Sequence, residues 1–152
     1  MDKKRKAYST ALAVLCALTA IFIWSNSLFS REGSQGQSRA VMEALEPVIE
    51  FVTGQDVDPE DDHFVRKLAH FLEFGLLGAE LTLLAYLRKR LSLQSLCNCL
   101  SVGLAVAVTD EALQLLSDRG SQVQDVLLDL CGVCTALALT AAILAASAKR
   151  RD

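Results

Sequence analysis

Four long apolar stretches, separated by polar segments, dominate the hydropathy pattern of the chain. They cover about residues 7–29, 68–87, 91–116 and 125–148. As a helix, each stretch is long enough to cross a hydrocarbon core of about 30 Å. The pattern therefore predicts an all-α membrane protein, a bundle of four transmembrane helices in a single domain that covers residues 1–152.

The first apolar stretch follows the basic segment "MDKKRK", which could also begin a signal peptide. No small-x-small cleavage site follows a short apolar core, and the apolar run is long for a signal peptide. We therefore expect an uncleaved transmembrane helix, with Trp24 as an anchor at the membrane interface.

The polar segment 30–67 contains both prolines of the chain and three of its eight glycines. Within it, "VMEALEPVIEFV" (41–52) alternates apolar and acidic positions at helical spacing. This spacing predicts a short amphipathic helix that lies on the membrane surface or caps the bundle.

The composition agrees with a membrane protein, because 52% hydrophobic residues and a mean hydropathy of +0.33 are high for a soluble domain. A net charge of −3 gives no reason to expect nucleic-acid binding, and the lipid bilayer is the expected surrounding. The distribution of charge is more informative. Basic residues gather before the first stretch, between the second and third, and after the fourth, whereas segment 30–67 holds nine acidic and four basic residues. By the positive-inside rule, both termini are expected in the cytoplasm.

Charged side chains interrupt the second apolar stretch along one helical face. At 100° per residue, Arg66, His70, Glu73, Leu77 and Glu80 point in similar directions. A charge at mid-membrane costs about 2.5–3.5 kcal/mol on insertion scales, so these groups are expected to face the bundle interior.

The third and fourth stretches carry a matching set of polar groups around their connection. Asp110 and Gln114 are one helical turn apart and Glu111 is adjacent, while Asp125 and Asp129 share a face of the fourth stretch. With the predicted topology, all of these groups fall in the outer half of the membrane. Interhelical hydrogen bonds alone could explain one such residue, but convergence of the whole set favours a polar site open to the outside.

These residues resemble the VanZ-like family of small bacterial membrane proteins. The resemblance rests on "RKLAHFLEFGLLG" (66–78), on "TDEALQLLSDRGSQVQDVLLDLCG" (109–132) and, more weakly, on "WSNSLFSREGSQGQS" (24–38). The matching positions are Lys67, His70, Glu73, Phe74, Asp110, Glu111, Gln114, Arg119, Asp125, Asp129 and Gly132. The resemblance implies a multi-pass protein of the bacterial plasma membrane and a link to teicoplanin resistance, which is associated with the namesake of the family.

Two functions are consistent with this pattern. The first is an enzyme that acts on an amphiphilic envelope substrate, such as a lipid-linked cell-wall precursor, at the outer leaflet. His70 is then the candidate general base, oriented by Glu73 or Glu111, and neighbouring acids have separated pKa values. The catalytic candidates are His70, Glu73, Asp110 and Glu111, and the substrate-binding candidates are Arg66, Lys67, Gln114, Arg119, Asp125 and Asp129.

The second function is that of a non-catalytic accessory protein, whose charges form a structural ion-pair network or a site for a glycopeptide or partner. Pairs of Arg119 with Asp125 or Asp129 would be typical of it. The chain has no nucleophile elbow, P-loop or zincin helix, and four helices without repeats do not favour a transporter. A cation held by Glu111, Asp125 and Asp129 is a weaker idea, so no metal site is predicted and the cofactor is left open.

The five cysteines all lie in apolar stretches, which does not favour a disulfide-stapled secreted domain. Cys131 and Cys134 form a C-x-x-C that could be redox-active or half of a metal site. Since no second ligand pair is near, the preferred interpretation is two small hydrophobic residues on a helix.

Overall fold

A computed structural model describes residues 2–28, 63–88, 91–117 and 122–150 of the chain. These residues form four long helices: α1 (Lys3–Leu28), α3 (His63–Leu87), α4 (Leu93–Leu116) and α5 (Val123–Lys149). All four are long and apolar enough to cross a membrane, and the described residues include no strand. The predicted all-α, four-helix membrane architecture is thereby confirmed.

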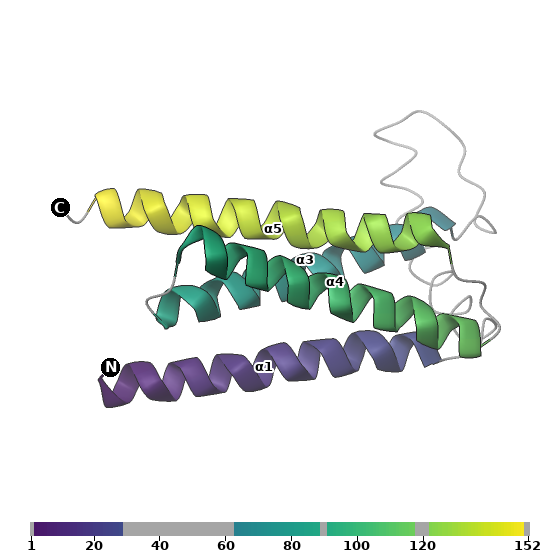
Figure 1. The fold of residues 1–152 in the computed structure, drawn as a ribbon, viewed down its shortest axis with the longest axis horizontal. Helices are drawn as coiled ribbons and strands as arrows, with labels where there is room; N and C mark the ends of the chain where they lie inside the picture. The colour runs from purple at the N-terminus through teal and green to yellow at the C-terminus, as the bar shows by residue number, and fades with distance from the viewer. Residues whose placement is uncertain (1, 29–62, 89–90, 118–121, 151–152) are drawn as a thin grey trace, which may run out of the picture.

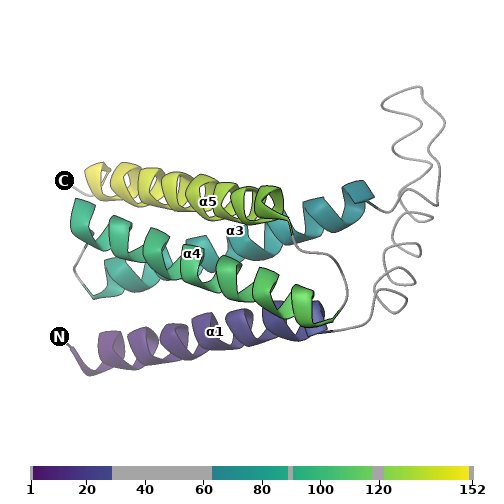
Figure 2. The same ribbon diagram turned by 45° about the vertical axis from the view of Figure 1, so that its right-hand side comes forward.

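Successive helices run in opposite directions, so that both ends of the chain lie at the same end of the bundle (Figure 1). Helices α3 and α4 lie between α1 and α5 (Figure 2). The most extensive interface joins α3 to α5. The arrangement leaves the ends of α1 and α4 and the beginnings of α3 and α5 together at the opposite end of the bundle.

Many large apolar side chains point outward, while several polar side chains are buried beside a small apolar core. Leu72 and Leu76 of α3 are exposed, as is Ile143 of α5, whereas Thr82 and Glu80 are buried. Exposed apolar surface on this scale requires a lipid environment. The bundle therefore presents its hydrocarbon side chains to the membrane and keeps its polar groups inside.

Glycines allow α3 and α5 to approach closely. A Cβ at Gly132 would collide with the backbone carbonyl of Phe71, and a Cβ at Gly78 would lie 2.7 Å from the carbonyl oxygen of Val133. Small residues at a helix crossing permit such backbone contact in membranes. The close approach sets the distance at which side chains of α3 face those of α5.

Basic residues connect the helices at the end that carries the termini. Arg5 donates from Nε to the carbonyl oxygen of Leu87 at 2.6 Å and from Nη2 to that of Tyr86 at 3.0 Å. Arg88 donates to Ser9 Oγ at 3.2 Å. The arginine at the start of α1 thus satisfies carbonyls that the end of α3 leaves without intrahelical partners.

Some predicted features lie at or beyond the edge of the described residues. Helix α3 begins at His63, earlier than the predicted start of the second span at 68. The amphipathic helix predicted within 41–52 lies outside the described residues. The orientation of the termini toward the cytoplasm stays a prediction. All five cysteines are free, and Cys131 and Cys134 are exposed on α5.

Candidate functional site

The polar groups of all four helices meet at the end of the bundle remote from the termini. Helix α1 contributes the side chains just before its end, α3 those of its first turns, α4 those of its last turns and α5 those of its first turns. Ser117 Oγ donates to the carbonyl oxygen of Ser27 at 2.9 Å, which holds the end of α4 against the end of α1.

At the centre of this region, the imidazole of His70 lies against two carboxylates from different helices. His70 Nδ1 is 3.9 Å from Asp110 Oδ2 and 3.7 Å from Asp129 Oδ1. The side chains of Asp110 and Asp129 are 0% and 1% exposed, whereas that of His70 is 21% exposed. We call these three residues the central cluster. Its histidine connects a buried pair of acids to the surface.

Asp110 is fixed by donors on two helices. Its Oδ1 accepts a hydrogen bond of 2.5 Å from Ser27 Oγ, and its Oδ2 accepts one of 2.8 Å from Gln114 Nε2. Ser27 comes from α1, while Gln114 lies one turn further along α4. Hydrogen bonds to a charged acceptor in a buried site are strong, so this carboxylate is held in one orientation.

Asp129 differs from Asp110 because both of its carboxylate oxygens are buried and neither accepts a hydrogen bond from the described residues. Its Oδ1 lies 3.7 Å from His70 Nδ1. Buried carboxylates are normally compensated by several donors. The central cluster therefore combines one well-held carboxylate with one that lacks donors.

Two further acids bind backbone or amide groups around the central cluster. Asn26 Nδ2 donates to Glu73 Oε1 at 3.1 Å, which links α1 to α3. Glu111 Oε2 accepts a hydrogen bond of 3.0 Å from the backbone N–H of Gln122, the residue before α5. A carboxylate at this place suits the partial positive charge of a helix N-terminus. Glu111 thus stabilises the beginning of α5.

The rim of the region carries an exposed ion pair. Lys67 Nζ is 3.8 Å from Asp125 Oδ1, with side chains 41% and 28% exposed. Arg66 is half-buried in the same turn of α3. Arg119 lies outside the described residues, and so do its predicted pairs with Asp125 and Asp129.

Several predicted residues therefore meet at this end of the bundle. His70 Nδ1 faces the carboxylates of Asp110 and Asp129, and the orientation of His70 by Glu73 or Glu111 stays a prediction. Glu80, predicted on the same face as His70, accepts a hydrogen bond of 3.0 Å from Thr19 Oγ1 of α1. It belongs to a separate contact between α1 and α3.

Ser27 and Asn26 were not among the predicted site residues. Both lie in "WSNSLFS", the weakest of the segments that carried the resemblance, and both bind acids of the site. Their position at the polar end of the first apolar stretch was the one signal in the sequence. It could not distinguish them from Ser25, which is exposed and donates to the carbonyl oxygen of Ile21 in its own helix.

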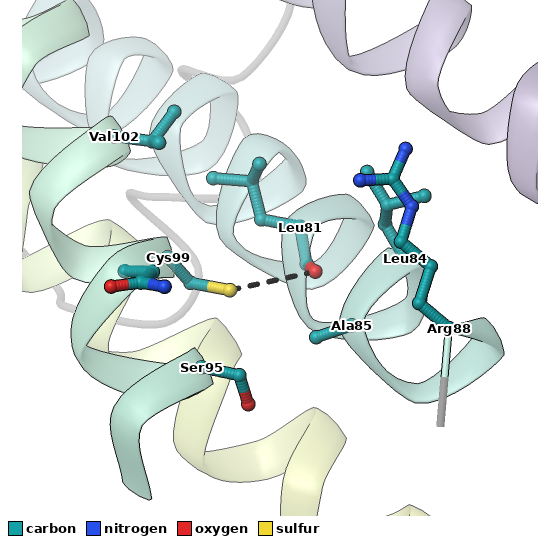
Figure 3. Close-up of a pocket in the computed structure, with 8 residues that line it drawn as sticks. Leu81, Leu84, Ala85, Arg88, Ser95, Cys99 and Val102 are labelled. Atoms are coloured by element: carbon teal, nitrogen blue, oxygen red, sulfur yellow. Dashed lines mark hydrogen bonds between the residues drawn. The ribbon is translucent and has the colours of Figure 1, made fainter. Parts of the chain in front are cut away.

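A cavity of about 240 Å³ lies between α3 and α4, nearer the end that carries the termini (Figure 3). Within it, Cys99 Sγ donates to the carbonyl oxygen of Leu81 at 3.5 Å. The cavity is lined by Leu81, Leu84, Ala85, Arg88, Ser95, Asn98, Cys99 and Val102. It includes no member of the central cluster, and its mainly apolar lining suits hydrocarbon rather than acid–base chemistry.

Comparison with protein families decides what kind of protein carries this site. A model of the VanZ/LLP1 family matches residues 11–144, which is most of the chain and covers α3, α4 and the greater part of α1 and α5. The chain belongs to the VanZ/LLP1 family. It matches no curated protein and no solved structure. With its four candidate spans, this VanZ/LLP1 protein is a multi-pass membrane protein.

Proposed function

We propose that this VanZ/LLP1 protein binds and acts on the polar headgroup of an amphiphilic lipid of the bacterial cell envelope, such as a lipid-linked cell-wall precursor. The observation that carries the proposal is the half-buried imidazole of His70 against the buried carboxylates of Asp110 and Asp129. A partly accessible imidazole on buried acids is an arrangement suited to proton transfer or ligand activation.

The surroundings of the central cluster suit a charged headgroup. Lys67 and Arg66 lie at the outer end of α3, where cations could contact phosphate or carboxylate groups, and Asp125 shares the rim. The exposed apolar faces of the helices allow the hydrocarbon chain of the same molecule to remain in the bilayer. A substrate with a polar head and a lipid tail matches both environments.

The proposed site lies in the outer half of the plasma membrane. Its end of the bundle is opposite the end with both termini, where Arg5 and Arg88 lie. Basic residues favour the cytoplasmic side. A lipid-linked cell-wall precursor would then be bound after its translocation, which is where a glycopeptide such as teicoplanin would also meet it.

A second candidate function is that of an accessory protein whose charges only hold the helices together. The fixed contacts of Asp110 with Ser27 and of Glu111 with Gln122 favour this alternative, because both acids bind neighbouring helices. The buried oxygens of Asp129 favour a site, because they accept no hydrogen bond from the described residues and a structural network would satisfy them.

Substitution of His70 separates the two functions. His70→Gln keeps a polar side chain of similar size but removes proton transfer and charge. In a glycopeptide-susceptible bacterium that expresses the protein, we expect wild type to raise the inhibitory concentration of teicoplanin and His70→Gln to abolish that effect. Purified wild-type protein in nanodiscs is expected to bind a lipid-linked cell-wall precursor at least tenfold more tightly than the variant.

The matched control is Leu76→Val, which alters an exposed side chain of the same helix. It should leave resistance and binding unchanged. Membrane levels and thermal unfolding must be equal in all three proteins. If His70→Gln unfolds the protein, or if wild type neither binds the precursor nor alters susceptibility, the accessory alternative is supported instead.

A further inference from the structure

We propose that His70, Asp110 and Asp129 bind a single divalent metal cation of the first transition row, Zn²⁺ or Mn²⁺. The three side chains offer donor atoms that all lie within 4.8 Å of one another. This inference deepens the proposed function, since the cation would be the reactive group of the headgroup site. The alternative considered from the sequence was a cation held by Glu111, Asp125 and Asp129. Only Asp129 belongs to both sets of ligands.

The spacing of the donor atoms fits a shared ion better than direct contact. The distances of 3.7 and 3.9 Å from His70 Nδ1 to the two carboxylates exceed the usual length of a hydrogen bond, about 2.7–3.2 Å. Ligand atoms about 2.1 Å from a tetrahedral Zn²⁺ are about 3.4 Å apart. The two distances from His70 Nδ1 exceed this spacing by only about 0.3 and 0.5 Å.

A divalent cation would also suit the chemistry of the central cluster. Its two acids are buried, and the imidazole of His70 is the basic group that the structure places against them. Uncompensated charge is costly in the interior of a membrane protein. A divalent cation with a neutral imidazole leaves the cluster without net charge.

Asp129 supplies an independent observation. Its side chain is 1% exposed, and neither oxygen has a hydrogen-bond partner in the described part of the chain. A buried, donor-free carboxylate directed at an imidazole and a second carboxylate is unfavourable as it stands. Coordination of a metal would satisfy both oxygens.

The hydrogen bonds of Asp110 resemble the outer shell of a metal site. Ser27 and Gln114 each donate to this carboxylate and fix its direction. Carboxylates that ligate metals are commonly oriented by such donors, whose loss lowers metal affinity by about 10–100-fold. A mixture of one imidazole and two carboxylates suits Zn²⁺ or Mn²⁺, and three protein ligands leave a coordination position open.

The open position identifies the chemical class of the substrate. A divalent cation in a three-ligand site polarises phosphoryl or carbonyl oxygens and activates water. His70 is the exposed member of the cluster, so a ligand would approach the cation from its side, beside Lys67. We therefore infer that the headgroup bears a phosphate or diphosphate whose oxygen binds the cation.

Metal binding can be measured without any assay of activity. Purified protein in nanodiscs is stripped with EDTA, then titrated with Zn²⁺ and with Mn²⁺ alone by calorimetry, and bound metal is counted by mass spectrometry. We expect one equivalent for wild type and at least a hundredfold weaker binding for Asp129→Asn and His70→Ala. Ser27→Ala should bind about tenfold to a hundredfold more weakly than wild type.

Asp125→Asn is the matched control, because it removes a carboxylate one turn away on the same helix, at the rim. It should retain one equivalent, with a far smaller loss of affinity than Asp129→Asn, because Asp125 is not one of the three ligands. Apo Asp129→Asn should unfold at the same temperature as apo wild type or higher, since the carboxyl group that it replaces accepts no hydrogen bond from the described residues. The metal site is disproved if stripped wild type binds no more Zn²⁺ or Mn²⁺ than Asp129→Asn, or if Asp125→Asn loses the metal equally. Loss of precursor binding in His70→Gln, with no metal in wild type, would leave the proposed function standing and reject the metal alone.

Discussion

At the scale of single residues, Ser27 joins the end of α1 to α4 through two contacts. Its Oγ donates to Asp110, and its backbone carbonyl accepts from Ser117. A hydrogen bond to a buried charged acceptor contributes about 1.5–3 kcal/mol to stability. The contribution is large because water cannot replace the lost donor at a buried acceptor. The smallest side chain of the site therefore fixes the orientation of its best-held acid.

We expect Ser27→Ala to lower the free energy of unfolding by about 1.5–3 kcal/mol. Ser25→Ala removes a hydroxyl two residues away, which is exposed and bonds only within α1, and should change stability by less than about 0.5 kcal/mol. Thermal unfolding of both variants in the same detergent measures the difference. Equal stabilities would mean that the bond from Ser27 to Asp110 contributes nothing.

Glu80 is a structural acid rather than a member of the central cluster. It is buried, its Oε1 accepts from Thr19, and its Oε2 has no hydrogen-bond partner in the described part of the chain. Glu80→Gln keeps the accepting oxygen and removes the costly charge, so we expect unchanged or higher thermal stability. Thr19→Val should lower stability by about 1 kcal/mol. A marked loss of stability in Glu80→Gln would show that the charge itself is required.

At the scale of helices, the crossing of α3 and α5 depends on how closely each glycine approaches the backbone of the other helix. A Cβ at Gly132 meets the carbonyl oxygen of Phe71, whereas one at Gly75 meets its nearest atom, the carbonyl oxygen of Gly132, at 3.7 Å. Both glycines lie inside helices, where alanine is intrinsically favoured by about 1 kcal/mol. The two substitutions thus differ mainly in steric contact.

Gly132→Ala should lower the free energy of unfolding by about 1–3 kcal/mol through overpacking. Gly75→Ala should be neutral or slightly stabilising, because its new methyl group makes an ordinary van der Waals contact. Unfolding curves of the two variants, compared with wild type, test this directly. Equal destabilisation by the two substitutions would show that close backbone contact at Gly132 does not determine the stability of the interface.

Helical periodicity predicted most of what belongs to a single helix. It placed His70 on the polar face of one helix and Asp129 on that of another, as observed. It could not predict which acid faces which base, because periodicity gives a direction about the axis of one helix and says nothing of the neighbour. Glu80 shows this limit, since it shares the face of His70 but contacts Thr19. Ser27 was missed because its partner lies on α4, far away in sequence.

At the scale of the whole molecule, the two ends of the bundle have different chemistry. One end carries the termini and the contacts of Arg5 and Arg88 with neighbouring helices. The other carries the central cluster and the rim pair of Lys67 with Asp125. With four candidate spans among the described residues, we expect both termini on the same side of the membrane, and the basic residues at that end favour the cytoplasm.

Cysteine labelling tests this orientation in intact cells. In a variant with all native cysteines replaced by serine or alanine, single cysteines are introduced as Gln124→Cys beside the polar site and Leu91→Cys between α3 and α4, both at exposed positions. A membrane-impermeant maleimide should label the cysteine at 124 in intact cells and that at 91 only after lysis. Labelling in intact cells at position 91 alone would indicate the opposite orientation. The site would then open to the cytoplasm and could not bind cell-wall precursors displayed on the outer leaflet. The orientation therefore decides which lipids can reach His70, independently of the chemistry that the central cluster performs.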